Sequence, residues 1–358
     1  MPLNALTRGD TSMNKMKAAI YSGVEKIGIQ EVDWIKPAPG YIVLDTKQTG
    51  ICGSDLHSYF GEWPQSDTLA AGHETCGIVT ELGEGVTKFK VGDKATAECF
   101  SHCGKCVFCR KGYYNHCKTR KWISHEAHGG FAEYTILHES GLFKLPDHMS
   151  FEDGTLVEPL AVSHRAVARG NVNARSTVAI IGGGTIGQLC LADAVAVGAK
   201  ETLITIKYER QAQLAKELGA DHIVDVRETD VAKYVNDITG GLGMDAVIET
   251  VGGGQNFDAA MEMVRPCGFV VLVAGYFKPL EVNLARVVWS EATVTGSSCY
   301  GYSGMETDFE AAIELIDSGK VDAKKLVTHR FPLMDIAEAF KIAADKQSGS
   351  IKVHVCQP

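Results

Sequence analysis

Long hydrophobic runs are missing from this 358-residue sequence, since no window reaches the roughly 18 apolar residues that a membrane-spanning helix needs. Residues 1–15 contain no apolar segment of the kind found in a secretory signal peptide. Basic residues are also outnumbered: 35 Lys and Arg against 44 Asp and Glu leave a formal net charge of −9, and no basic block is present to attract a nucleic acid or a membrane surface. We therefore expect a cytoplasmic protein that acts on a small molecule, with no nucleic-acid or membrane partner.

The apolar content is high enough for more than one hydrophobic core. Hydrophobic residues make up 45% of the chain, and 358 residues exceed what a single core usually supports. We expect about two domains with a cleft between them.

Four of the eleven cysteines lie within fifteen positions, in the stretch CGKCVFCRKGYYNHC. A disulfide framework is typical of short secreted chains, so metal ligation is the better explanation in a chain of this length without a leader. The spacing C-x2-C-x2-C-x7-C predicts a closed tetrahedral structural zinc site, whose ligands are Cys103, Cys106, Cys109 and Cys117. Cys99, just outside the pattern, is expected to be a small buried hydrophobic residue.

Two further stretches carry metal-capable side chains beside glycines. GICGSDLH at residues 50–57 contains Cys52, and AGHETCGIV at residues 71–79 contains His73 followed by Glu74. Taken singly, a buried Cys or a His in a loop is more often structural than a metal ligand.

The stretch from Ser176 to Ala199 predicts a nucleotide-binding unit. A β-branched apolar strand at about 177–181 precedes G-x-G-x-x-G and then a helix with apolar residues at 186, 190, 194 and 197, which is the dinucleotide fingerprint. The residues expected to receive the pyrophosphate are Gly182, Gly184, Thr185, Ile186 and Gly187. Strand-helix alternation continues in ETLITI, HIVDV, MDAVIET and FVVLVAG, which predicts a doubly wound parallel sheet over about residues 164–304.

The position that usually selects NAD lacks a carboxylate. An acidic residue about twenty positions beyond the glycines normally accepts hydrogen bonds from the adenosine ribose, and here the count reaches Ile206. Lys207, Tyr208 and Arg210 follow, and the two cations favour the 2′-phosphate of NADP. In the alternative interpretation these cations only solvate the next helix, Glu209 reaches the ribose and the cofactor is NAD.

Taken together, these motifs resemble the zinc-dependent medium-chain dehydrogenase/reductase family, from MKAAIYSG at residue 16 to the C-terminus. GICGSDLH, GHE, the four-cysteine lobe, EPLAVSHRAV and the glycine fingerprint occur in the order of the family, most similar to its sorbitol, butanediol and threonine dehydrogenases. The resemblance implies an α/β fold: a mainly β, GroES-like catalytic domain at residues 1–163 with its zinc lobe at 99–117, a Rossmann domain at 164–304, and a return to the catalytic domain at 305–358.

The resemblance also implies the site residues. A catalytic zinc would be bound by Cys52, His73 and a carboxylate, for which Glu158 is favoured over Glu74. Ser54 and His57 match the positions of a proton relay away from the alcohol. Two zinc ions per chain and a homodimer or homotetramer are expected.

The substrate is specified less well. The family's polyol dehydrogenases carry an Arg-Tyr pair late in the chain, whereas SSCYGYSG at residues 297–304 has Tyr300 and Tyr302 but no arginine. The aromatic residues of YFGEWPQSD, which are Tyr59, Phe60 and Trp63, favour an apolar or small secondary alcohol, or its ketone, if they line the pocket rather than a core. The alternatives are an NAD-dependent polyol, diol or amino-alcohol dehydrogenase, a pseudo-enzyme, or a zinc ribbon that binds nucleic acid through CRKGYYNHCKTRKW.

Overall fold

The computed structural model describes residues 15–34 and 36–358, which form two compact units. Unit 1 runs to Glu158 and resumes from Val327 to Pro358, and unit 2 is Pro159–Leu326. The helix α3 (Phe151–Arg169) contains the first boundary between them. Among the described helices, none is long and apolar enough to cross a membrane.

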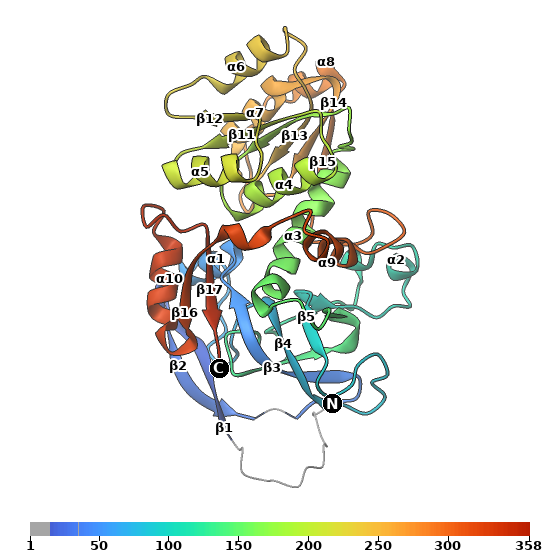
Figure 1. Ribbon diagram of the computed structural model, residues 1–358, viewed down its shortest axis with the longest axis vertical. Helices are drawn as coiled ribbons and strands as arrows, with labels where there is room; N and C mark the ends of the chain where they lie inside the picture. The colour runs from blue at the N-terminus through green and yellow to red at the C-terminus, as the bar shows by residue number, and fades with distance from the viewer. Residues whose placement is uncertain (1–14, 35) are drawn as a thin grey trace. The chain divides into compact units, whose positions relative to one another are not determined.

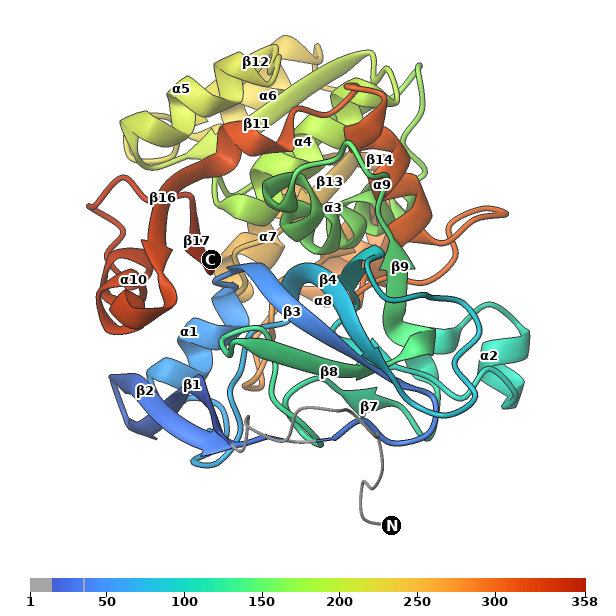
Figure 2. The ribbon, with the colours of Figure 1, turned by 60° about the horizontal axis from the view of Figure 1, so that its bottom comes forward.

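Unit 1 is built on a seven-stranded sheet with the order β16-β17-β3-β4-β5-β9, in which β8 also pairs with β3 (Figures 1 and 2). Its strands are β3 (Tyr41–Gly50), β4 (Glu74–Leu82), β5 (Lys94–Ala97), β8 (Tyr134–His138), β9 (Leu142–Lys144), β16 (Val327–Pro332) and β17 (Lys352–Cys356). The other strands of the unit are β1 (Lys15–Gly23), β2 (Lys26–Asp33), β6 (Phe100–Ser101) and β7 (Lys121–Trp122). Its short helices are α1 (Gly53–Tyr59), α2 (Val107–Arg110) and α10 (Ile336–Ala344), with 3-10 turns at Tyr114–His116, Glu139–Gly141 and Leu333–Asp335.

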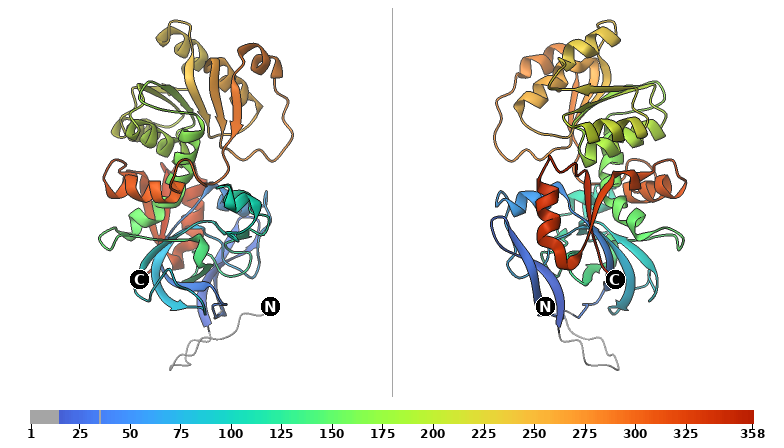
Figure 3. Two further views of the ribbon diagram at one scale, coloured as in Figure 1. Left: turned by 90° about the vertical axis from the view of Figure 1, so that its right-hand side faces the viewer. Right: turned by 60° about the vertical axis from the view of Figure 1, so that its left-hand side comes forward.

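The C-terminal segment belongs to unit 1 because its last strand completes the sheet. Strand β17 pairs antiparallel with β3, and His354 lies opposite Gly50. Helix α10 contacts β16 and β17 (Figure 3), and its apolar positions 336, 339, 340 and 343, which recur at helical spacing, are buried. Strand β1 and helix α10 thus contribute to one hydrophobic core.

Unit 2 contains a six-stranded parallel sheet with the order β12-β11-β10-β13-β14-β15. Its strands are β10 (Thr177–Ile181), β11 (Glu201–Ile206), β12 (His222–Asp225), β13 (Met244–Glu249), β14 (Val264–Leu272) and β15 (Thr293–Gly296). Its helices are α4 (Thr185–Ala196), α5 (Glu209–Glu217), α6 (Val231–Ile238), α7 (Gly254–Met263), α8 (Leu284–Ser290) and α9 (Asp308–Asp317), with a 3-10 turn at Ala323–Leu326. The strand order reverses between β10 and β13, as in a doubly wound fold. The predicted fold class is confirmed.

The domain boundaries differ from the expected 163/164 and 304/305, most of all at the second one, which lies after Leu326. Helix α9 belongs to unit 2 because Asp308 accepts a hydrogen bond from Arg165 at 3.2 Å in the buried interior. Phe309 also packs edge-to-face on Tyr300, with ring centroids 4.8 Å apart. A buried ion pair and an aromatic contact of this kind hold the segment after residue 304 on the nucleotide unit.

Candidate functional site

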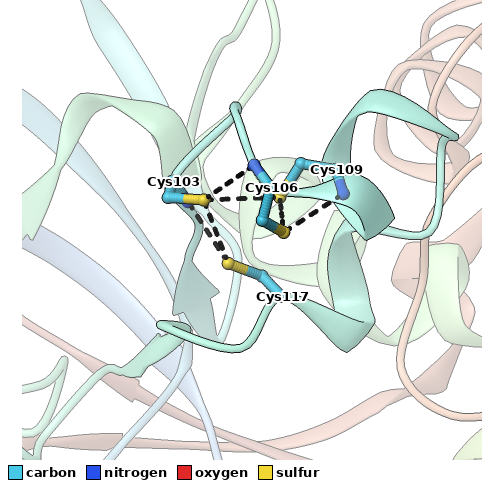
Figure 4. A group of neighbouring side chains, drawn as sticks. All are labelled: Cys103, Cys106, Cys109 and Cys117. Atoms are coloured by element: carbon cyan, nitrogen blue, oxygen red, sulfur yellow. Dashed lines mark hydrogen bonds between the residues drawn. The ribbon is translucent and has the colours of Figure 1, made fainter.

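The four-cysteine lobe brings its sulfur atoms to one point (Figure 4). The Sγ atoms of Cys106 and Cys109 are 3.5 Å apart, as are those of Cys103 and Cys117, and all four lie within 4.8 Å of one another. The backbone N–H groups of Lys105 and Cys106 lower the pKa of Cys103 to about 6, which favours the thiolate that binds metal. Four converging sulfur atoms with no other donor in the group fit a closed tetrahedral zinc site.

Local backbone geometry produces this convergence. Cys106 caps the N-terminus of α2, and its sulfur accepts a hydrogen bond from the Cys109 N–H at 3.5 Å. Gly104 and Gly112 have φ of +67° and +81°, values that a residue with a side chain rarely adopts.

A second group combines Cys52, His73 and Glu74, whose ligand atoms also lie within 4.8 Å of one another. Cys52 immediately precedes α1, and His73 immediately precedes β4. Glu74 is the first residue of β4 and pairs with Gly50 of β3. A Cβ atom at Gly50 would lie only 2.0 Å from Glu74 Oε2, so glycine at this position makes room for the carboxylate. One Cys, one His and a carboxylate are the donor set of a catalytic zinc site that keeps a position open.

Asp55, which was not predicted as a site residue, lies beside this group and contacts two of its members, Cys52 and His73. Its carboxylate accepts a hydrogen bond from the Cys52 N–H at 2.9 Å and lies 3.8 Å from His73 Nδ1, with only 4% of the residue exposed. Burial lowers the pKa of His73, but the neighbouring Cys52 and Asp55 outweigh burial and hold that pKa well above its ordinary value. The site therefore attracts a positive charge, either a proton or a metal ion.

Lys352, which was also not predicted as a site residue, reaches the group from β17. Its Nζ donates to both oxygens of Glu74, at 2.7 and 2.6 Å, and to the Ile51 carbonyl at 3.1 Å. Lys352 and Glu74 are 2% and 1% exposed, so the ion pair is completely buried. No local signal marks Lys352, because a lysine in a short terminal strand is normally a solvated residue.

Glu158, the favoured third ligand, lies in α3 and is 4% exposed. Its charge raises the pKa values of both His73 and Lys352, which indicates that it lies near the group. The three ligand atoms that lie within 4.8 Å of one another are nevertheless those of Cys52, His73 and Glu74.

The expected relay residues lie on one short helix. Ser54 and His57 are three positions apart in α1, which places them on one face. His57 Nδ1 forms a hydrogen bond with the Glu62 carboxylate, and its ring stacks on Trp63 with centroids 5.6 Å apart. Of the aromatic residues expected near the pocket, Tyr59 instead belongs to the core of unit 1, where it is 5% exposed.

The glycine fingerprint forms a tight turn between β10 and α4. Gly182 has φ of +111°, and a Cβ atom at Gly187 would lie 1.8 Å from the Gly182 carbonyl oxygen. Thr185 and Ile186 form the first turn of α4, whose N-cap is Gly184. The first N–H groups of a helix have no acceptor within the helix itself, so a helix start of this kind is suited to bind a pyrophosphate.

At the adenosine end, Ile206 ends β11 and is buried, while Lys207 is exposed. The N–H groups of Lys207 and Tyr208 both donate to Gln211 Oε1, at 2.9 and 3.2 Å. Arg210 lies 3.9 Å from Glu217 on the outside of α5.

A carboxylate does lie beside Ile206, on the neighbouring strand, because Asp225 of β12 is its partner in the sheet register. Asp225 is engaged by Arg227, whose Nε and Nη2 both donate to it, and this contact lowers the pKa of Asp225 to about 2.

Comparison with known proteins gives the same two parts. Residues 38–147 match the alcohol dehydrogenase GroES-like domain and residues 185–318 match the zinc-binding dehydrogenase domain. A sorbitol dehydrogenase from Halalkalibacterium halodurans is 35% identical over 344 residues, which covers 94% of this chain and 98% of the relative.

Two solved structures extend the comparison. The 2R,3R-butanediol dehydrogenase from Bacillus subtilis superposes with a TM-score of 0.84 at 34% identity, covering 95% of this chain and 99% of that one. A zinc-binding dehydrogenase from Sinorhizobium meliloti bound to NADP superposes with a TM-score of 0.85 at 29% identity, covering 96% and 99%.

Proposed function

Since the chain belongs to the zinc-dependent medium-chain dehydrogenase/reductase family and is a zinc-dependent oxidoreductase of alcohols or polyols, we propose that it transfers hydride between a secondary alcohol or polyol, or the matching ketone, and NADP. The observation that carries the proposal is the convergence of Cys52 and His73 beside buried carboxylates. Glu74 lies within 4.8 Å of both, and Glu158 is buried and close enough for its charge to raise the pKa of His73. A donor set of this type suits a metal that must also accept a substrate oxygen.

A catalytic zinc would be held by Cys52, His73 and Glu158. When bound, the ion supplies Lewis-acid chemistry that lowers the pKa of a substrate hydroxyl. Glu158 is supported as the third ligand by its burial and by the effect of its charge on His73. Both oxygens of the alternative ligand, Glu74, accept hydrogen bonds from Lys352.

Proton removal falls to Ser54 and His57. Ser54 accepts the substrate proton and passes it to His57, which lies on the same face of α1. Glu62 and Trp63 orient the His57 ring through a hydrogen bond and a stacking contact, so the imidazole has a defined direction for receiving the proton.

The structural zinc would be held by Cys103, Cys106, Cys109 and Cys117, giving two zinc ions per chain. This ion cross-links the lobe and takes no part in the chemistry. None of the eleven cysteines, all of which lie within the described residues, forms a disulfide, which supports a reducing, cytoplasmic location.

NADP is favoured by charge at the end of β11. Lys207 and Arg210 can each form a charge-assisted hydrogen bond with a 2′-phosphate, each contributing on the order of 1.5–3 kcal/mol. The NADP-bound relative from Sinorhizobium meliloti supports the proposal.

The decisive experiment measures kcat/KM with NADP and NAD for wild type and for the Lys207→Ala/Arg210→Ala double variant. The wild type should prefer NADP by about tenfold or more, since 1.4 kcal/mol corresponds to a factor of ten, and the variant should lose that preference. A wild type that prefers NAD, or a variant whose preference does not move, would refute the assignment.

One observation favours an NAD-dependent polyol, diol or amino-alcohol dehydrogenase as the second candidate. Asp225 lies beside Ile206 in the sheet and could accept hydrogen bonds from ribose hydroxyls if Arg227 released it. In that case Asp225→Asn would weaken NAD binding and leave NADP binding unchanged.

For the substrate, we infer a small or apolar secondary alcohol. Trp63 supplies apolar surface beside the proposed relay residue His57. Residues 297–304 also lack the arginine of the Arg-Tyr pair found in the polyol dehydrogenases of the family. A panel of secondary alcohols, diols and polyols, assayed with both cofactors, tests this inference.

The exposed surface of unit 2 supports a homodimer or a homotetramer. Strand β15 forms the edge of the sheet, with backbone groups open to another strand on one side. The preceding helix α8 exposes Leu284, Val288 and Trp289 by 62%, 71% and 87%. An edge strand next to apolar side chains is suited to pairing with a second copy of the chain.

A further inference from the structure

Glu249 is a buried carboxylate at the carboxyl end of β13, with 0% of its surface exposed. Its Oε1 accepts hydrogen bonds from the N–H groups of Val251 and Gly252, both at 2.7 Å, and its Oε2 accepts one from the Tyr276 hydroxyl. A buried carboxylate is costly unless such donors surround it. Glu249 therefore holds the two N–H groups and the Tyr276 hydroxyl close together.

The loop that follows β13 rests on the glycine fingerprint. Thr250 donates through both its N–H and its Oγ1 to the Ile181 carbonyl, at 3.1 and 2.8 Å. A Cβ atom at Gly182 would lie 2.6 Å from Val251 Cγ2, so Val251 packs directly over the turn. Glu249 therefore fixes a loop that borders the expected pyrophosphate position.

The loop that follows β14 packs against this first loop at two further points. A Cβ atom at Gly252 would lie 3.4 Å from Ala274 Cβ, and one at Gly254 would lie 2.7 Å from the Glu281 carbonyl oxygen. The Tyr276 hydroxyl donates a side-chain hydrogen bond to Glu249, and this bond joins the second loop to the end of β13.

The topology relates these loops to one half of the cofactor. In a doubly wound sheet a dinucleotide lies across the carboxyl ends of the strands, with one mononucleotide on each side of the point where the strand order reverses. That point lies between β10 and β13, and the ribose position at Ile206 lies on the β11 side. The nicotinamide half therefore lies over the carboxyl ends of β13 and β14.

We infer that Glu249 and Tyr276 form a latch, the Glu249–Tyr276 hydrogen bond, that holds the two loops together and sets the affinity for the nicotinamide half of the cofactor. Both are positioning residues, because they act through the loops that they join. The inference applies equally to NAD and to NADP, so it does not depend on which of them the enzyme prefers.

The test compares wild type with Tyr276→Phe, which removes only the hydroxyl, in the full-length protein. Calorimetric titrations measure the Kd for NADP, for NAD and for the adenosine fragments 2′,5′-ADP and ADP. The dinucleotide to compare is whichever of NADP and NAD binds wild type more tightly. We expect Tyr276→Phe to weaken its binding by about tenfold, as expected for the loss of one hydrogen bond to a charged group, and to change fragment binding less than twofold. Amide exchange at Val251 and Gly252 should accelerate in the variant.

The matched control is Tyr234→Phe. It removes a hydroxyl that forms a hydrogen bond at 2.9 Å with His222, which lies at the amino end of β12. This control should leave all four affinities unchanged. Glu249→Gln, which keeps an acceptor for the two amides, should fall between wild type and Tyr276→Phe.

Three results would overturn the inference. Dinucleotide affinity in Tyr276→Phe could stay within twofold of wild type, fragment affinity could fall as much as dinucleotide affinity, or the Tyr234→Phe control could lose as much.

Discussion

Replacing Lys352 with Met tests the buried ion pair beside the candidate catalytic zinc site. Methionine is unbranched, so it fills most of the space of the lysine stem while removing all three donated hydrogen bonds. Glu74 then remains 1% exposed without its cationic partner. Breaking a buried pair from one side costs about 3–5 kcal/mol, because the remaining charge is uncompensated.

The assay is thermal unfolding of the zinc-depleted protein, followed by calorimetry. The transition of unit 1 should fall by on the order of 10 °C, since each kcal/mol corresponds to about 2–4 °C for a unit of this size. The double variant Lys352→Met/Glu74→Gln should recover much of the loss, because it removes the unpaired charge. The control Lys341→Met, which disrupts an exposed contact with Glu338 at 3.8 Å, should change the free energy of unfolding by less than about 0.5 kcal/mol.

The same variant bears on the third zinc ligand. With Lys352 absent, both Glu74 oxygens become available to a metal, so a zinc ion bound at Cys52 and His73 should be released to a chelator more slowly and turnover should fall. A loss of stability below about 1 kcal/mol, or a double variant no more stable than the single one, would refute the reasoning about the pair.

Four further predictions concern the rest of the chain. Cys106→Ser should reduce the zinc content from about two ions per chain to about one and lower the unfolding temperature, which metal analysis and thermal unfolding will check. Cys52→Ser should abolish turnover with little change in circular dichroism, which kinetics and the spectrum will check. Burial lowers the pKa of His164, but its hydrogen bond and ion pair with Asp193 outweigh burial and raise that pKa above 6.5. Protonated His164 thus stabilises unit 2 below about pH 6.5, and this contribution is lost as pH rises through the raised pKa. In denaturant unfolding, His164→Gln should therefore lose more free energy of unfolding relative to wild type at about pH 5.5 than at about pH 8.5. Trp289→Glu should shift the protein toward the monomer in sedimentation, and an unchanged assembly would exclude α8 from the interface.

The sequence alone was sufficient wherever the chemistry lies within a short stretch. Five of the six strands of the nucleotide sheet are found where apolar runs predict them, as in β10 at Thr177–Ile181 and β13 at Met244–Glu249. The edge strand β15 at Thr293–Gly296 was not predicted. The cysteine lobe and the glycine turn are equally local, because their geometry depends on two-residue gaps and on glycine conformations. The family and the reaction class, predicted from the order of these motifs, are confirmed by the matched domains and relatives.

Tertiary structure decided the contacts between distant segments. Lys352 reaches Glu74 across 278 positions because β17 pairs with β3, and Asp225 lies beside Ile206 because β11 and β12 are neighbours in a parallel sheet. The second domain boundary likewise follows the buried bond between Arg165 and Asp308. Spacing within a motif is set by local backbone geometry and can be read along the chain, but a buried charge is stable only where the folded chain brings it a partner, and strand pairing selects that partner.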